Sequence, residues 1–335
     1  MGHNGTPTSH DQPELAEKPS RRGRIATRMV KFVVKRWKKG DPPTVVRQAR
    51  RVFGLPNFLT FLYSRHLKIR GIESPVRGEW LTADGAGSSG KVLLYLHGGG
   101  YVSCSPQTHR PITTTLARLV KCRVFALDYR LAPEHPFPAA VDDASAAFLW
   151  LLESGVPAEN IALAGDSAGG GLVMATMLRS RQQGRSMPAC AVCLSPWANL
   201  TGFGKYRNAG SCSMFNPDDV TTFAKIYLRG ASAELPEASP VFADLSGLPP
   251  LLIQASSTEL LFNDSVLLHE KALRYGVRST LRIYPGLPHV WQILVGTIPE
   301  AKAALEEIAS FIVAAFERQN IPTTVPSTVG IESRP

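Results

Sequence analysis

Residues 161–175 read IALAGDSAGGGLVMA. Small apolar residues, typical of a buried strand, lead into the pentapeptide GDSAG, after which a helical pattern begins. A serine flanked by glycines at such a junction is the pattern of the nucleophile elbow, a tight turn that holds a hydroxyl above a sheet. The turn crowds its own backbone, so residues 165 and 169 must be glycine. The pattern predicts that Ser167 is a nucleophile, although Gly-x-Ser-x-Gly alone also occurs by chance in loops.

Apolar strand-like segments alternate with helical patterns on both sides of this junction. The strand segments have no polar face, which is typical of a parallel sheet covered by helices on both faces. Right-handed crossovers then bring the carboxyl ends of the strands to one edge, where ligands bind in open α/β sheets. We therefore expect an α/β fold. The predicted strands cover residues 91–99, 122–130, 160–167, 189–197, 249–256 and 279–286, and the predicted helices cover residues 110–121, 139–155, 168–184, 264–276 and 299–316.

A second glycine-rich loop follows the first predicted strand. His97 is followed by Gly98, Gly99 and Gly100. Glycines let main-chain N–H groups turn toward a bound oxygen without interference from side chains. In folds with a nucleophile elbow, this loop and the N–H of Ala168 form the oxyanion hole. The chain has neither Gly-x-Gly-x-x-Gly nor Gly-Lys-Ser/Thr, which argues against a nucleotide-phosphate loop.

The partner of the serine should be a histidine late in the chain, because the elbow fold has the order serine, acid, histidine. His289, in YPGLPHVW, follows a predicted strand and satisfies this order. His109 and His135 precede the serine and do not. Two acids remain in QASSTELLFNDS. Glu259 lies directly past a strand, whereas Asp264 opens a helix, where an acid commonly stabilises the N-terminus. We therefore prefer Glu259.

These motifs together resemble the hormone-sensitive lipase family of α/β-hydrolases, the bacterial type IV esterases. The resemblance rests on HGGGY at 97–101, DYRLAPE at 128–134, GDSAGG at 165–170 and Pro288-His289, and it covers residues 75–318. It implies an eight-stranded, mostly parallel sheet with helices on both faces and a helical cap. The family usually has Asp-Pro-Leu-x-Asp in the acid loop, where this chain has ELLFN from Glu259.

The activity that the resemblance implies is that of a serine carboxylesterase. Ser167, His289 and Glu259 would form the catalytic triad. Gly99, Gly100 and Ala168 would be the oxyanion donors, with Gly98 shaping the turn. The implied substrates are short-chain acyl esters, acetylated small molecules or lactones, and neither a metal nor an organic cofactor is required.

Several further side chains are candidates for the substrate pocket. Asp166 adjoins the nucleophile, and we expect it to support the elbow, because one acid suffices for a triad. The aromatic candidates for the pocket wall are Tyr101, Trp197, Phe203 and Phe215, each of which could equally be ordinary core or cap packing.

The positive charge of the chain is concentrated near its N-terminus. The net charge is +10, and residues 1–52 hold 13 basic against 4 acidic residues, which leaves the remainder nearly neutral. Within this arm, residues 24–37 place Ile25, Met29 and Phe32 near helical spacing among basic residues. The segment is either a helix covering the pocket, which we prefer, or an interfacial helix on an anionic membrane surface.

The expected organisation follows from these patterns. We divide the chain into a disordered tail (1–20), N-terminal cap helices (21–65) and a catalytic domain (66–318) that carries an irregular cap insert at 202–245. A loose tail follows at 319–335. Five cysteines and the lack of an apolar leader favour the cytoplasm.

The expected partner is a small-molecule ester and not a nucleic acid. A weak anionic membrane contact through residues 21–52 and a homodimer stay open. The alternative functions are a non-catalytic small-molecule-binding protein on the same fold and a membrane-peripheral lipase.

Overall fold

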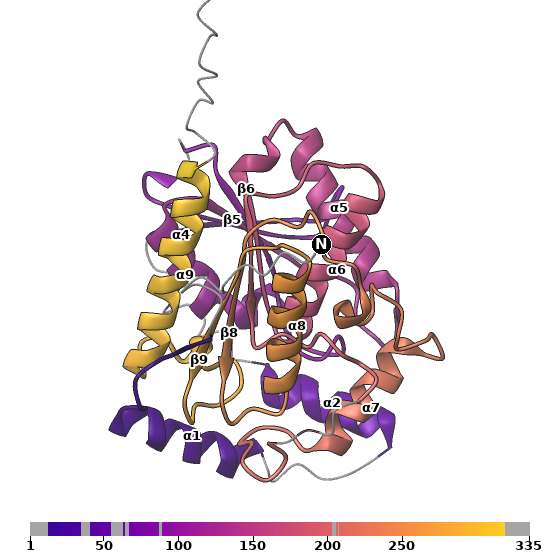
Figure 1. Cartoon of the computed structure of the whole chain (residues 1–335), viewed down its shortest axis with the longest axis vertical. Coiled ribbons are helices and arrows are strands. Elements are labelled where there is room, and N and C mark those ends of the chain that lie inside the picture. Colours follow the sequence, from indigo (N-terminus) through magenta and orange to yellow (C-terminus); the bar gives the residue numbers. More distant parts are fainter. Residues whose placement is uncertain are drawn as a thin grey trace, which may run out of the picture.

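The computed structural model describes residues 13–34, 41–54, 63, 67–86, 89–202, 206 and 208–318. Its strands are β1 (Glu14–Leu15), β2 (Leu67–Ile72), β3 (Gly78–Ala83), β4 (Val92–Leu96), β5 (Arg123–Leu127), β6 (Ile161–Asp166), β7 (Cys190–Leu194), β8 (Leu251–Ser256) and β9 (Ser279–Tyr284). They form one sheet in the order β1-β9-β8-β7-β6-β4-β5-β3-β2 (Figure 1). Only the β2–β3 and β3–β5 pairs are antiparallel among these strands. The predicted mostly parallel α/β sheet is confirmed.

The strand number differs from the expected eight, because nine strands lie in the described residues. The additional edge strand, β1, falls in the segment 1–20 that we expected to be disordered. Its main chain pairs with β9 in parallel, and the Glu14 carboxylate pairs with the Arg282 guanidinium. This strand is held by main-chain hydrogen bonds and one ion pair, and it buries no apolar side chain. Its sequence therefore lacks the apolar pattern from which strands are predicted.

The helices are α1 (Arg21–Val34), α2 (Pro42–Phe53), α4 (Arg110–Val120), α5 (Ala139–Glu153), α6 (Ala168–Gln182), α7 (Pro217–Leu228), α8 (Phe262–Arg274) and α9 (Pro299–Arg318). Short 3-10 helices cover Pro106–His109, Ala158–Asn160, Pro240–Phe242 and Trp291–Leu294. Among the described segments, no helix combines the length and apolarity needed to cross a bilayer.

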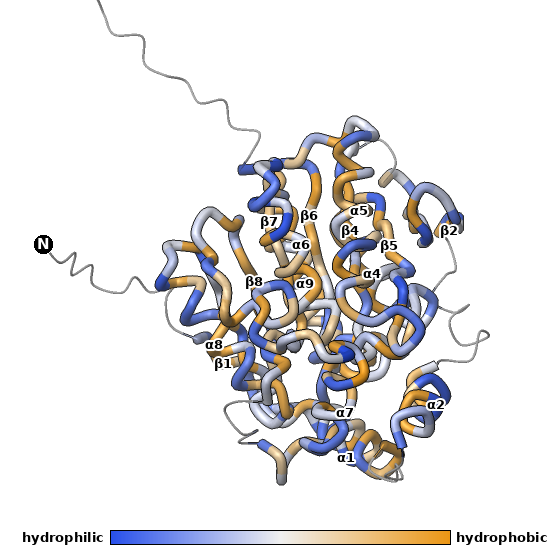
Figure 2. The backbone as a smooth tube through the Cα atoms, turned by 90° about the vertical axis from the view of Figure 1, so that its right-hand side faces the viewer, coloured by the Kyte–Doolittle hydropathy of each residue, from blue (hydrophilic) through white to orange (hydrophobic). Residues whose placement is uncertain are grey.

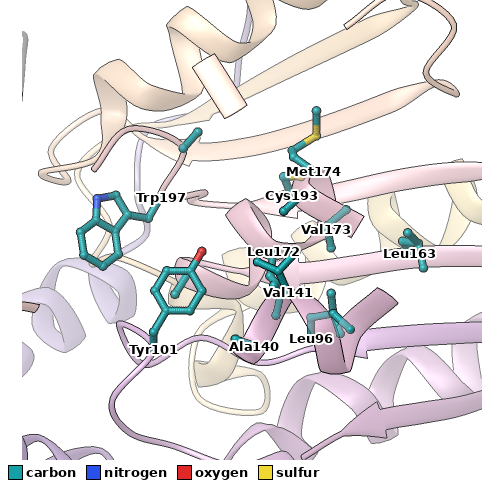
Figure 3. Packing of buried hydrophobic residues seen from close by; sticks show 14 of the residues in the cluster. Leu96, Tyr101, Ala140, Val141, Leu163, Leu172, Val173, Met174, Cys193 and Trp197 are labelled. Atoms are coloured by element: carbon teal, nitrogen blue, oxygen red, sulfur yellow. The ribbon is translucent and has the colours of Figure 1, made fainter. Parts of the chain in front are cut away.

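Two apolar cores lie on opposite faces of the sheet. Side chains of α5, α6 and α8 pack against one face, and side chains of α4 and α9 pack against the other. Figure 3 shows part of the first core, which contains Leu163 of β6, Leu96 of β4, Val141 of α5 and Leu172 of α6. Cys190 and Cys193 of β7 are fully buried in these cores, as expected for a central strand.

The helix α7 lies inside the insert that we expected to be irregular. Asn216 and Asp219 form a capping box at its start, and Pro217 occupies its first turn. The main-chain N–H of Asn216 donates to the Asp219 carboxylate at 2.8 Å. These signals of a helix start were present in the sequence and went unused.

The helices α1, α2 and α7 lie at the same end of the molecule in two perpendicular views (Figures 1 and 2). The helix α2 is tied to the body through Arg50, whose guanidinium binds both carboxylate oxygens of Glu134, at 2.8 and 2.7 Å, and donates to the Val102 carbonyl at 2.9 Å. By contrast, α1 packs beside α9, and the Thr27 hydroxyl donates to the Gly286 carbonyl at 3.1 Å.

The turn between β6 and α6 brings two backbones unusually close together. Ser167 has φ 52° and ψ −120°, a conformation that L-residues rarely adopt. A Cβ atom on Gly169 would lie 2.0 Å from the Leu96 carbonyl oxygen, and a Cβ atom on Gly165 would lie 2.4 Å from the Gly169 carbonyl oxygen. Hydrogen bonds from Ser167 N–H to the Leu194 carbonyl, at 2.8 Å, and from Trp197 N–H to the Ser167 carbonyl, at 2.8 Å, fix the turn.

We expect Gly169→Ala to lower the free energy of unfolding by about 3 kcal/mol, because the added methyl meets rigid backbone and the turn must shift. Urea unfolding followed by circular dichroism measures this change. Gly210→Ala is the matched control, since a Cβ atom there meets nothing within 4 Å. Equal stability of the two variants would contradict this account of the turn.

Candidate active site

Three side chains from separate strand ends form a continuous chain of hydrogen bonds. Ser167 follows β6, Glu259 follows β8 and His289 follows β9. Ser167 Oγ lies 2.9 Å from His289 Nε2, and His289 Nδ1 lies 2.5 Å from Glu259 Oε2. Ser167 is 8% exposed, Glu259 is 1% exposed and His289 is 4% exposed. The structure therefore brings together the three residues that the sequence selected.

The direction of proton donation follows from the chemistry of the partners. An ionised carboxylate can only accept, so the proton on the His289 ring lies on Nδ1 and is donated to Glu259. The free Nε2 then accepts the hydroxyl proton of Ser167. Glu259 is itself held in place, because its Oε1 accepts the N–H of Ser256 at 2.9 Å.

The second acid of the loop has a different environment. Asp264 Oδ2 accepts the main-chain N–H groups of Ala198 and Asn199, at 3.0 and 2.9 Å. Burial raises the pKa of Asp264 to about 8, against the lowering effect of these two N–H donors. Asp264 fixes the chain that leaves β7, and no hydrogen bond joins it to His289 in the part of the chain described here.

The glycine loop after β4 lies beside Ser167. Gly99 and Gly100 have φ angles of 109° and 63°, which favour glycine, and both line the pocket that contains Ser167. The N–H of Gly98 donates to Asp166 Oδ1 at 3.1 Å. Since that N–H is already used, the donors open to a bound oxygen are those of Gly99, Gly100 and Ala168, which donate to no other described residue.

The buried carboxylate of Asp166 lies beneath this loop and has several hydrogen-bond partners. Besides Gly98, its carboxylate accepts the Tyr95 hydroxyl at 2.7 Å and lies 3.2 Å from His109 Nε2. Burial opposes both charges, but the attraction between the two groups raises the pKa of His109 and lowers that of Asp166. The ion-pair form is therefore favoured. Asp166 supports the elbow and the glycine loop together, the role that its position beside Ser167 suggested.

The ring of His97 lies outside the serine–histidine chain. It stacks on Tyr129 with ring centroids 4.3 Å apart, and its Nδ1 lies 2.7 Å from the Gly98 carbonyl. Burial lowers the pKa of His97 to about 3, so the ring is neutral. A neutral, stacked ring braces the loop.

A pocket of about 770 Å³, open mouth included, lies above Ser167. Burial raises the pKa of Cys104 to about 12, so this lining thiol is neutral and no rival nucleophile. The pocket wall is otherwise mostly apolar and aromatic; it is formed by Phe53, Gly99, Gly100, Cys104, His109, Asp166, Ser167, Trp197, Met214, Phe215, Val220, Phe223, Leu261, His289, Val290 and Ile293.

Only some of the aromatic residues predicted for the pocket wall line the pocket in the structure. Trp197 and Phe215 line the pocket, and the Phe215 ring meets the His289 ring edge-on at a centroid distance of 5.5 Å. Tyr101 does not line it; its ring is buried against Tyr227 with centroids 3.7 Å apart. Phe203 lies outside the described residues.

Sequence reasoning missed most of the apolar wall. Phe53 comes from the end of α2, where a short amphipathic pattern was a usable signal. Most other missed residues lie in or near the cap insert and in the loops after β8 and β9, which have no periodic pattern. The expected cover of the pocket by residues 24–37 is wrong for residues 24–34, because no residue of α1 is among the described lining residues, and residues 35–37 lie outside the described residues.

No group of three or more His, Cys, Asp or Glu side chains that could hold a metal ion occurs within the described ranges. The polar groups that line the pocket are the Ser167 hydroxyl, the His289 imidazole and the main-chain N–H groups of the glycine loop, with the paired His109 and Asp166 and the Cys104 thiol beside them. This set suits nucleophilic attack on a carbonyl carbon and stabilisation of the resulting oxyanion.

Comparison with known proteins identifies relatives among the hydrolases. A family model described as alpha/beta hydrolase fold matches residues 93–293. An acetyl-hydrolase of Streptomyces hygroscopicus is 42% identical over 236 residues, which cover 70% of this chain and 78% of the relative. An esterase of Acinetobacter venetianus is 36% identical over 239 residues, with 70% and 78% covered. The crystal structure of an esterase from the bacterial hormone-sensitive lipase family matches with a TM-score of 0.82 and 38% identity, covering 90% of this chain and 100% of the other.

The family match spans more than half of the chain and contains the elbow, the glycine loop and the acid and histidine loops. By their names, one of these relatives is an acetyl-hydrolase and the other is an esterase. The chain therefore belongs to the α/β-hydrolase fold family and is a carboxylic ester hydrolase of the hormone-sensitive lipase type.

Proposed function

We propose that this hydrolase cleaves esters with Ser167 as nucleophile, His289 as general base and acid, and Glu259 as the acid that orients the imidazole. The observation that carries this proposal is the hydrogen-bonded chain from Ser167 Oγ through His289 to Glu259, with links of 2.9 and 2.5 Å. A non-catalytic binding protein on this fold would not need these three groups in line. Their alignment favours catalysis.

In the first step, Ser167 Oγ attacks the ester carbonyl carbon while its proton moves to His289 Nε2. The imidazolium that forms is stabilised by the Glu259 carboxylate, which stays ionised. The carbonyl oxygen becomes an oxyanion, and the N–H groups of Gly99, Gly100 and Ala168 donate to it. Each such donor contributes about 3–4 kcal/mol to the transition state in well-studied hydrolases.

The tetrahedral intermediate collapses when His289 returns the proton to the leaving alcohol oxygen. The acyl group is now bonded to Ser167 Oγ. A water molecule then attacks the acyl carbon, with its proton taken by His289, and the same donors hold the second oxyanion. Proton transfer back to Ser167 Oγ releases the carboxylic acid and restores the enzyme.

The pocket wall supports neutral, apolar acyl esters as the substrate class. No Lys or Arg side chain is among its described lining residues, so a charged acyl group would lose its hydration without a partner. Short-chain acyl esters, acetylated small molecules and lactones all satisfy this requirement. Two relatives agree with this class: one is an acetyl-hydrolase by name, and one esterase crystal was soaked with p-nitrophenyl butyrate.

Ser167→Ala should lower kcat for p-nitrophenyl butyrate by about 10⁴-fold or more, because the nucleophile is lost while the fold is kept. Release of p-nitrophenol measures this rate. Ser310→Ala, on the exposed side of α9, is the control and should leave the rate unchanged. A Ser167→Ala enzyme with substantial turnover would contradict the assignment.

Glu259→Gln should lower kcat by about 10²–10⁴-fold, because an amide no longer stabilises the imidazolium. Asp264→Asn keeps an oxygen acceptor for the N–H groups of Ala198 and Asn199, and should change kcat less than about tenfold. Both rates are measured with the same ester after circular dichroism has shown native folding. If Asp264→Asn alone abolishes turnover in a folded protein, Glu259 is not the triad acid.

The mono-p-nitrophenyl ester of succinic acid should be hydrolysed with a kcat/KM at least about 100-fold below that of p-nitrophenyl butyrate. The two acyl chains have equal length, and they differ in the terminal carboxylate that the apolar wall cannot solvate. Parallel p-nitrophenol assays give the ratio. Comparable values for the two esters would show that the acyl group is not held against the apolar wall.

A further inference from the structure

The helix α1 presents a stripe of large apolar side chains to solvent. Ile25, Met29, Phe32 and Val33 are 46%, 64%, 67% and 61% exposed. Spacings of three and four residues place them on one side of the helix. The side chains that α1 buries are small or at its end: Gly23, Ala26 and Val34. The helix thus docks through its small residues and leaves its most apolar face outward, which a helix of a globular protein normally avoids.

Basic side chains accompany this stripe along the whole helix. The 14 residues of α1 contain Arg21, Arg22, Arg24, Arg28 and Lys31, and no acidic residue. All five are exposed. Within the described part of the chain, no ion pair joins any of them to a carboxylate. The helix surface is therefore apolar and cationic at once, and both properties face solvent.

The cationic surface continues beyond the helix. Arg21 and Arg22 line an open groove together with Lys302 of α9, which is itself exposed. Ser20 and Thr297 also line the groove. Lys302 also pairs with Glu306 at 3.4 Å, so Arg21 and Arg22 are the cations of this groove that no described carboxylate pairs. Cations beside an apolar stripe match a lipid surface, where anionic headgroups lie above acyl chains.

The helix is firmly attached at the end of the molecule that holds the pocket. Ser20 N–H donates to the Glu300 carboxylate, and the Thr27 hydroxyl donates to the Gly286 carbonyl, three residues before His289. Figures 1 and 2 show α1 at the same end as α2 and α7, whose side chains line the pocket. A surface bound by α1 therefore lies beside the cap and not behind the sheet.

We propose that α1 docks this enzyme onto an anionic lipid surface, with Ile25, Met29 and Val33 at the acyl boundary and the basic side chains against the headgroup phosphates. An exposed apolar stripe with Lys and Arg on its polar borders is the design of an interfacial helix. Each cation near such a surface adds attraction.

A second copy of this chain and a nucleic acid both match the surface of α1 less well than a lipid surface does. A second copy docked through α1 would bring two purely cationic helices together and would repel. A nucleic acid would satisfy the cations but would offer phosphates, and no apolar layer, to the exposed stripe. An anionic lipid surface matches both the charge and the apolar side chains.

The experiment is co-sedimentation of the full-length protein with vesicles of phosphatidylcholine alone or mixed equally with phosphatidylglycerol. The protein should bind the mixed vesicles and not the neutral ones, and added salt should weaken this binding. Arg21→Gln/Arg28→Gln/Lys31→Gln should bind about 100-fold more weakly, from about 1 kcal/mol per cation. Ile25→Ser/Met29→Ser should bind at least about tenfold more weakly.

The matched control is Lys68→Gln/Arg70→Gln, which removes two exposed cations from β2 and should keep vesicle binding. Every variant should hydrolyse p-nitrophenyl butyrate at the unaltered rate without vesicles, which shows that each is folded. Equal binding to both kinds of vesicle, or undiminished binding by the α1 variants, overturns the proposal. So does a dimer in solution that Ile25→Ser/Met29→Ser abolishes while no vesicle binding occurs, because a second copy would then be the occupant.

Discussion

The active site depends on one close approach, that of Gly169 to the carbonyl oxygen of Leu96. The first turn of α6 reaches the carboxyl end of β4 so closely that no side chain fits between them. This contact sets Ser167 beside the glycine loop that follows β4. It also places Asp166 directly beneath that loop, where its carboxylate accepts the Gly98 N–H. The proposed nucleophile and the proposed oxyanion donors are thus positioned by the same piece of backbone.

Three buried carboxylates near this turn have separate tasks, and their surroundings determine them. Glu259 accepts hydrogen bonds from one main-chain N–H group and from the His289 ring, so its carboxylate can stabilise a positive charge on that ring. Asp166 is paired with His109 and holds the loop in place. Asp264, which burial keeps largely neutral with a pKa of about 8, fixes the chain after β7. Of these three carboxylates, only Glu259 contacts the His289 ring.

The fold and the centre of the site could be predicted because local chemistry specifies them. Apolar strands alternate with helices, the turn at Ser167 demands glycine, and the order of serine, acid and histidine leaves His289 as the partner. Trp197 and Phe215 of the pocket wall were predicted, but most of the wall could not be, because Phe53 of α2 and Phe223 of α7 reach the same pocket only in the folded chain. The strand β1 was missed for a related reason, since main-chain pairing at a sheet edge needs no apolar pattern.

The position of α1 could not be predicted from the sequence either, since an amphipathic basic helix can cover a pocket or face outward. Its small residues Gly23 and Ala26 decide the matter by permitting close packing beside α9. The apolar stripe is then left on the outside, at the pocket end of the molecule. Catalysis and the proposed surface contact therefore involve different residues, and each can be changed without the other.

The most direct test of the central claim is covalent labelling with diethyl p-nitrophenyl phosphate, a phosphorylating analogue of an ester, followed by peptide mass spectrometry. The account predicts one diethylphosphoryl group per chain, bonded to Ser167, with loss of activity in proportion to labelling. It also predicts that unfolded protein is not labelled there, because the hydroxyl is activated only beside His289. Inactivation with the label on another residue, or full labelling of Ser167 with activity retained, would contradict it.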